Sequence, residues 1–131
     1  ADIKREGTDV TIVSFGKIIK EAYKAADELA KENISCEIID LRTVRPLDTE
    51  AILKSVKKTN RLVILEEAWP FGNVATEITF QVQSKAFDYL DAPIEKINTA
   101  DTPAPYSPVL LKEWLPNSED VINSVKKVLY K

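Results

Sequence analysis

The sequence has no histidine, no methionine, a single cysteine and only three glycines among its 131 residues. Without histidine, the chain lacks the commonest general base and the commonest transition-metal ligand of proteins. A Ser-His-Asp triad, a Cys-His pair and a histidine-based zinc site are therefore excluded within it. One thiol cannot form an internal disulfide, which favours a reducing compartment. We interpret Cys36 as a small buried hydrophobic residue in a strand. We expect the chain to contain no catalytic residue and no metal ligand.

The sequence also lacks a long apolar run and a strong excess of charge. No run approaches the roughly 20 residues that span a bilayer, and the polar N-terminus is not a signal peptide. The net charge of −3, with both signs interspersed, indicates neither nucleic acid nor a membrane as a partner. Because an initiator methionine is missing, we expect a fragment of a longer chain. The length and the 44% hydrophobic content predict one soluble domain over residues 1–131.

Strand and helix patterns alternate along the chain. Apolar runs predict central strands at 10–15 and 62–67 and a further strand at 34–41, and polar segments predict edge strands at 2–5 and 94–99. Apolar residues recur at helical spacing over 18–33, 48–58, 73–86 and 117–129. Asp48 and Asn117 are typical N-cap residues. The alternation predicts an α/β fold with a mostly parallel sheet and helices on both faces, three layers in all.

Two further segments lie outside this alternation. Residues 1–9 form an entry segment that contains at most a short edge strand. Residues 100–116 carry four of the seven prolines, and we interpret them as an extended strap that wraps a neighbour or its own sheet. The strap contains no catalytic constellation.

The stretch 61–75 carries the candidate site. The strand at 62–67 ends in Glu66 and Glu67, and an aromatic-proline turn follows before Gly72 and Asn73 open a helix. If the two central strands are neighbours, their carboxyl ends form a crevice, the usual ligand position in open α/β sheets. The candidate crevice or interface residues are Phe15, Gly16, Glu66, Glu67, Trp69, Pro70, Phe71, Gly72 and Asn73.

Several interpretations of these residues compete. Adjacent strand residues point to opposite faces, so Glu66 and Glu67 do not form an acid–base pair, and one of them is expected to accept helix or loop donors. Gly72 opening a helix is a weak anion-binding signal, and a structural turn or an interface is favoured. Loop aromatics as dense as Trp69 and Phe71 are typical of subunit contacts. For Arg42 and Arg45, which are able to bind an anion, we favour ion pairs.

Four segments, over residues 5–16, 40–48, 66–78 and 100–108, carry a family resemblance that covers nearly the whole chain. The most specific is Asp40-Leu-Arg-Thr-Val-Arg-Pro-Leu-Asp48. Together they resemble the C-terminal domain of the beta subunit of 2-oxoacid dehydrogenases of the pyruvate dehydrogenase type, within the transketolase C-terminal domain family. The resemblance implies a five-stranded mixed sheet of order 1-3-2-4-5 with the first strand antiparallel, instead of a hairpin between 2–5 and 10–15.

The resemblance also implies a function. It implies an oxidoreductase of a multienzyme complex that uses thiamine diphosphate with Mg²⁺ to decarboxylate a 2-oxoacid and acylate a lipoyl group. The cofactor would lie outside this domain, so no cofactor-binding residue is expected here, and the isolated domain would be inactive. The implied partners are an alpha subunit and a second beta subunit in an α2β2 tetramer, and the peripheral-subunit-binding domain of the acyltransferase. The implied location is the bacterial cytoplasm or the mitochondrial matrix.

Alternatives remain open. Transketolase and deoxyxylulose-phosphate synthase share the domain type, and a small-anion-binding regulatory module that uses the crevice is a non-enzymatic alternative. The sequence departs from many relatives at Ala68, where they have glycine, and in a helix start at Gly72 that is less rich in glycine. A methyl group at either place limits how closely a partner backbone approaches. The 2-oxoacid is left undecided because the substrate pocket of the family lies outside this domain.

Overall fold

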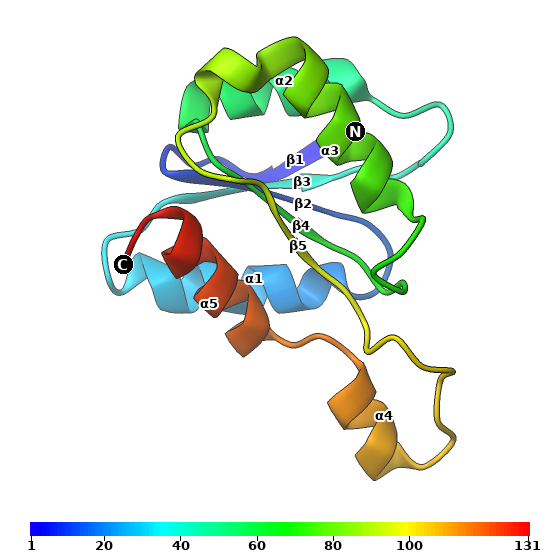
Figure 1. Cartoon of the computed structure of the whole chain (residues 1–131). Coiled ribbons are helices and arrows are strands. Elements are labelled where there is room, and N and C mark those ends of the chain that lie inside the picture. Colours follow the sequence, from blue (N-terminus) through cyan, green and yellow to red (C-terminus); the bar gives the residue numbers. More distant parts are fainter.

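A computed structural model of the chain describes all 131 residues and has three layers (Figure 1). Five strands form one sheet in the order β1-β3-β2-β4-β5, with β1 antiparallel to β3 and the other neighbours parallel. This confirms the predicted fold class, strand order and edge strands. The strands are β1 (Asp2–Arg5), β2 (Val10–Ser14), β3 (Cys36–Asp40), β4 (Leu62–Leu65) and β5 (Glu95–Ile97).

Helices cover both faces of the sheet. Helices α1 (Ile19–Ala30) and α5 (Ser118–Val128) pack together on one face, and α2 (Thr49–Thr59) and α3 (Val74–Ala86) pack on the other. A short 3-10 turn, η1 (Phe87–Tyr89), follows α3, and α4 (Pro108–Trp114) is described below. Each face has its own buried cluster, of 17 residues under α1 and α5 and 11 residues under α2 and α3. None of the helices combines the length and apolar character that a membrane span requires.

The alternation of side chains along β3 divides this strand between the two clusters. Cys36 and Ile38 lie in the cluster under α1 and α5, and Ile39 lies in the other cluster with Leu41, which follows the strand. Cys36 is buried, as predicted, and burial raises the pKa of its thiol to about 11. A thiol in this state packs as a small apolar group.

Side-chain caps fix where three helices begin. The Asp48 carboxylate accepts the Ala51 N–H at 3.1 Å, and the Asn73 amide oxygen accepts the Thr76 N–H at 3.0 Å. Asn117 and Asp120 form a reciprocal capping box at the start of α5. The predicted caps at Asp48 and Asn117 are confirmed.

The predicted strap is wrong in one respect, because residues 108–114 form helix α4. Pro108 stands in the first turn, where a missing N–H costs nothing, and the next six residues contain no glycine or proline. The prolines of this segment bracket the helix and do not interrupt it. We call residues 100–116 the arm. In Figure 1 the arm projects away from the sheet, so it does not wrap its own sheet.

A buried network of side-chain hydrogen bonds connects α2 to the sheet. Glu37 on β3 accepts hydrogen bonds from Lys58, from the Ser55 hydroxyl at 2.5 Å and from the Gly7 N–H at 3.2 Å. Thr11 on β2 shares hydrogen bonds with Ser55 at 2.6 Å and with Thr59 at 2.7 Å. Burial alone raises the pKa of Glu37, but its three donors outweigh burial and hold the pKa below the ordinary value.

Candidate interaction site at the turn and the arm

The candidate site lies where β2 and β4 end side by side. These strands are parallel neighbours, with Ser14 opposite Leu65, and the Ser14 hydroxyl donates to the Leu65 carbonyl at 2.8 Å. The predicted proximity of the two strand ends is therefore confirmed. Phe15 packs partly buried against the cluster under α2 and α3, and Gly16 is exposed with a φ of +74°. We call residues 66–73, which follow β4, the turn.

Glu66 lies inside the molecule and does not line a crevice. It has no exposed surface, and its carboxylate accepts the Ala75 N–H at 3.1 Å and the Asn98 amide at 2.8 Å. Burial raises the pKa of Glu66, against the lowering effect of these two hydrogen bonds. The prediction that one of the two glutamates accepts helix or loop donors is correct for Glu66. The expectation that Glu66 is exposed in the crevice or in an interface is wrong, because the first turn of α3 and Asn98 enclose it.

Glu67 points away from its neighbour. It is exposed, whereas Glu66 is buried, so the two carboxylates do not converge on one substrate position. They are therefore not arranged as an acid–base pair. The chain also contains no group of three or more His, Cys, Asp or Glu side chains placed to hold a metal ion.

The turn and the arm are joined by polar contacts to one carbonyl oxygen. The indole N–H of Trp69 in the turn donates to the Thr102 carbonyl at 2.8 Å, and the indole N–H of Trp114 donates to the same oxygen at 2.9 Å. The Ala100 N–H donates to the Trp114 carbonyl at 3.1 Å and closes the arm on itself. Both tryptophans of the chain thus meet at Thr102, and the turn and the arm form one unit.

Contacts from β5 and α3 hold the turn in place. Lys96 donates to the Pro70 carbonyl, and the Thr99 N–H donates to the Ala68 carbonyl at 3.0 Å. The Asn73 amide donates to the Trp69 carbonyl while its oxygen caps α3. The carbonyls of the turn are therefore bound by residues up to 31 positions further along the chain. The sequence does not predict the roles of Lys96, Asn98 and Thr102, since no local pattern marks a partner at this separation.

Large apolar side chains of this unit face outward. Phe71 in the turn is 89% exposed, and Val109 in α4 is 71% exposed. The others are Trp69, Tyr106 and Leu110. Exposed apolar side chains on a fixed backbone are typical of surfaces that bind another protein.

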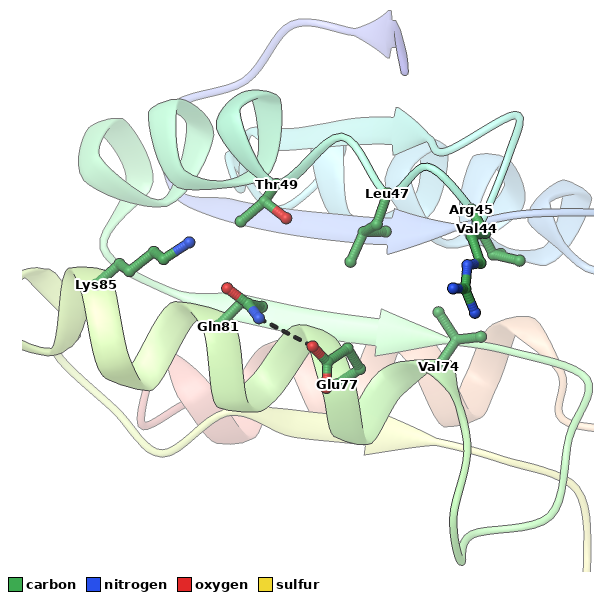
Figure 2. Close-up of a pocket in the computed structure, with 8 residues that line it drawn as sticks. All are labelled: Val44, Arg45, Leu47, Thr49, Val74, Glu77, Gln81 and Lys85. Atoms are coloured by element: carbon green, nitrogen blue, oxygen red, sulfur yellow. Dashed lines mark hydrogen bonds between the residues drawn. The ribbon is translucent and has the colours of Figure 1, made fainter.

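None of the main surface cavities is lined by Phe15, Gly16 or a residue of the turn. Cavities of about 280 to 640 Å³ lie elsewhere on the surface, and the largest lies between residues 44–49 and α3 (Figure 2). The two arginines of the loop before α2 differ. Arg42 pairs with Asp2 at 3.7 Å, as favoured above, whereas Arg45 has no carboxylate partner and lines the largest cavity.

A family model described as "Transketolase, C-terminal domain" matches residues 1–121. The chain is 55% identical over 130 residues to the pyruvate dehydrogenase E1 component subunit beta of Rickettsia felis, covering 99% of the chain and 40% of that protein. It is 49% identical over 131 residues to the mitochondrial pyruvate dehydrogenase E1 component subunit beta-1 of Arabidopsis thaliana, and the match covers 100% of the chain and 36% of that protein. The chain therefore spans about two fifths of the length of these relatives.

Among solved structures, the fold resembles one described as a split gene transketolase, inactive beta4 tetramer. The TM-score is 0.85 at 26% identity, and the match covers 98% of this chain and 41% of that one. The matched family is the one that the sequence resemblance names, and the structural match agrees with the fold described above.

Proposed function

Because the chain belongs to the transketolase C-terminal domain family, we propose that it is the C-terminal assembly domain of a beta subunit of a thiamine-diphosphate-dependent 2-oxoacid dehydrogenase. Identity near 50% to pyruvate dehydrogenase E1 beta subunits, over nearly the whole chain, supports pyruvate as the 2-oxoacid. In this role the domain supports oxidative decarboxylation and acyl transfer to lipoyl groups by holding subunits together, and it contributes no catalytic residue.

The observation that carries this proposal is the exposed apolar surface of the turn and the arm. Phe71, Tyr106 and Val109 stand on backbone that is fixed by Glu66 and by the two indole hydrogen bonds to Thr102. Aromatic side chains presented from a rigid frame are strong anchors in protein interfaces. We assign this surface to contact with the alpha subunit or the second beta subunit of an α2β2 tetramer.

A second apolar surface supports an additional partner. Around the end of α3, Phe87 and Tyr130 are exposed and border a cavity of about 470 Å³ with Leu90 and Ile94. This surface is a candidate for docking the peripheral-subunit-binding domain of the acyltransferase. The relatives come from a bacterium and from a source named as mitochondrial, so we place the protein in the bacterial cytoplasm or the mitochondrial matrix.

We propose that thiamine diphosphate with Mg²⁺ binds outside this domain. A Mg²⁺ ion on a diphosphate needs one or two carboxylate or amide ligands from the protein, and the two carboxylates after β4 point apart, with Glu66 buried and Glu67 exposed. The buried Glu66 is engaged by Ala75 and Asn98 and faces no cavity. We therefore place the cofactor on other parts of the enzyme.

Two alternatives receive less support. A domain of a transketolase itself is supported by a structural match at 26% identity, well below the 55% identity to a dehydrogenase subunit that shares the family. A small-anion module at the crevice between Gly16 and Glu67 is disfavoured because a buried carboxylate, Glu66, accepts the N–H at the start of α3 that an anion would need.

Hydrogen exchange in the assembled enzyme tests the assembly role. We expect the amides of the non-proline residues in 69–72 and 103–110 to exchange more slowly when the beta subunit that contains this domain is bound to the alpha subunit than in the 131-residue chain. The buried amides of β2 serve as the internal reference. Equal exchange of the turn and the arm in both samples would reject the proposed surface. Calorimetric binding of thiamine diphosphate and Mg²⁺ to the chain alone would reject the placement of the cofactor.

A further inference from the structure

A groove of about 640 Å³ lies between α3 and the segment that leads into α2 (Figure 2). One wall is formed by Val44, Arg45 and Leu47 of the loop and by Thr49, the first residue of α2, and the other is a stripe of α3. The stripe residues, Val74, Glu77, Gln81 and Lys85, are three or four positions apart and so lie on one face of the helix. At 1.5 Å per residue, the stripe gives the groove a length of about 16 Å.

The groove is formed before any ligand binds. Leu47 and Val74 pack against the buried cluster under α2 and α3, which fixes the apolar part of its surface. The loop is held by the Thr43 hydroxyl, which donates to the Pro46 carbonyl at 3.0 Å, and by the Asp48 cap of α2. A ligand therefore meets a surface that needs little ordering on binding.

The charges along the groove are not neutralised within the chain. Of the four arginines, Arg45 alone lacks a carboxylate within 4.0 Å, since the other three pair with Asp27, Asp2 and Asp91. Lys85 also lacks one. Glu77 is the sole acidic residue of the lining, and its carboxylate accepts the Gln81 amide at 2.9 Å and forms an ion pair with neither cation. Figure 2 shows Arg45 and Lys85 at opposite ends of the groove, with Glu77 and Gln81 between them.

We propose that this groove docks an extended segment of a partner polypeptide that carries a carboxylate at each end and an apolar side chain between them. One carboxylate would pair with Arg45, whose planar guanidinium suits it, and the other with Lys85. The apolar side chain would cover Val44, Leu47 and Val74. The peptide N–H groups of the segment would donate to Glu77 and to the Thr49 hydroxyl.

The length and the charge pattern select this occupant. About 16 Å corresponds to about five residues of extended chain at 3.3 Å per residue, whereas a small anion reaches only one of the two cations. Nucleic acid is disfavoured because Glu77 stands between the cations and the lining has an apolar portion. The groove shares no residue with the turn or the arm, so the inference does not depend on the surface proposed above for assembly.

Two labelled probe peptides test the inference on the 131-residue chain. The first has seven residues with a glutamate second from each end and a leucine at the centre, and the second replaces both glutamates by lysine. Fluorescence anisotropy gives the affinity, and amide chemical shifts give the location. The variants are Arg45→Gln and Lys85→Gln. Lys20→Gln is the matched control. Lys20 is an exposed lysine of helix α1, it has no carboxylate partner, and it lies on the opposite face of the sheet from the groove.

The expected result is that only the glutamate peptide binds, with shifts at Val44, Leu47, Val74 and Gln81. Arg45→Gln should weaken binding about fivefold and Lys85→Gln somewhat less, the range of partly exposed ion pairs, and Lys20→Gln should have no effect. Three results would overturn the inference. They are equal affinity for the lysine peptide, equal effects of Arg45→Gln and Lys20→Gln, or saturation of the same shifts by acetate or phosphate alone, which would make the groove a small-anion site.

Discussion

Replacing Glu66 should loosen the turn and the arm together. In Glu66→Ala the Ala75 N–H and the Asn98 amide lose their buried acceptor. Hydrogen bonds to a charged group contribute about 1.5–3 kcal/mol each, but the substitution also removes the cost of burying a charge, so we expect a net loss of about 2–3 kcal/mol. Glu66→Gln keeps the shape and one acceptor oxygen, and its cost should be about 1 kcal/mol.

Urea unfolding followed by tryptophan fluorescence and circular dichroism measures these losses. Both tryptophans bind the Thr102 carbonyl, so native fluorescence reports the junction of the turn and the arm. In Glu66→Ala we expect a red-shifted native emission as well as a lower urea midpoint. Glu67→Ala is the control, because Glu67 is exposed, and it should change stability by less than about 0.5 kcal/mol.

The pH dependence of the free energy of unfolding is the measurement that can refute this role of Glu66. Since the pKa of Glu66 is raised in the folded state, the native protein holds this proton more tightly than the unfolded chain. Stability is therefore lost as pH rises from the ordinary carboxyl pKa, about 4.3, through the raised folded pKa. Glu66→Gln lacks this dependence, so the stability difference between wild type and Glu66→Gln should shrink as pH rises. A difference that does not vary with pH, or a loss below about 1 kcal/mol in Glu66→Ala, would refute the role of Glu66.

Three further substitutions test other parts of the fold. Glu37→Ala should cost about 3 kcal/mol in urea unfolding because it leaves buried donors unpaired, whereas the exposed Glu6→Ala should cost less than about 0.5 kcal/mol. Hydrogen bonds lower the pKa of Glu37, so the stability that Glu37 contributes is present above the ordinary carboxyl pKa and is lost as pH falls through the folded pKa. If Glu37→Ala lost stability at low pH in the same way as wild type, this role of Glu37 would be contradicted. Gly7→Ala should lower the melting temperature strongly, because the added Cβ would lie 2.2 Å from the carbonyl carbon of Cys36. A variant that melts at the wild-type temperature would show that the backbone of β3 shifts to make room for the methyl group. Trp69→Ala should weaken association with the alpha subunit, measured by sedimentation, more than it lowers the melting temperature of the chain, and a loss confined to melting would place Trp69 in domain stability alone.

Local chemistry in the sequence was sufficient for most of the fold. The division of β3 between the two clusters and the caps at Asp48 and Asn117 follow from side-chain alternation and from short polar residues before apolar stripes. Helix α4 is not predicted from the sequence, because four prolines within residues 100–116 favour an extended chain. Pro108 starts the helix, and the prolines around it only limit its length.

The sequence predicts where the turn lies in the fold, but not the hydrogen bonds that hold it in place. Topology alone brings the ends of β2 and β4 together, so the place of the stretch after Leu65 in the fold follows from the strand order. The role of Glu66 depends on Asn98, 32 residues away, and Glu37 depends on Ser55, 18 residues away. Such contacts arise only when the sheet order is set, and a single sequence contains no periodicity that reports them.

The buried contacts of the turn explain how its exposed aromatics can serve binding. Glu66 fixes the start of α3 to the segment after β5, and Trp69 fixes the turn to the arm. Phe71 therefore stands on backbone that is already ordered, although its side chain is 89% exposed. Ordering a loop on association costs free energy that weakens binding, and a surface that is fixed in advance avoids that cost. Substitutions of the buried Glu66 should consequently weaken subunit association without touching any partner.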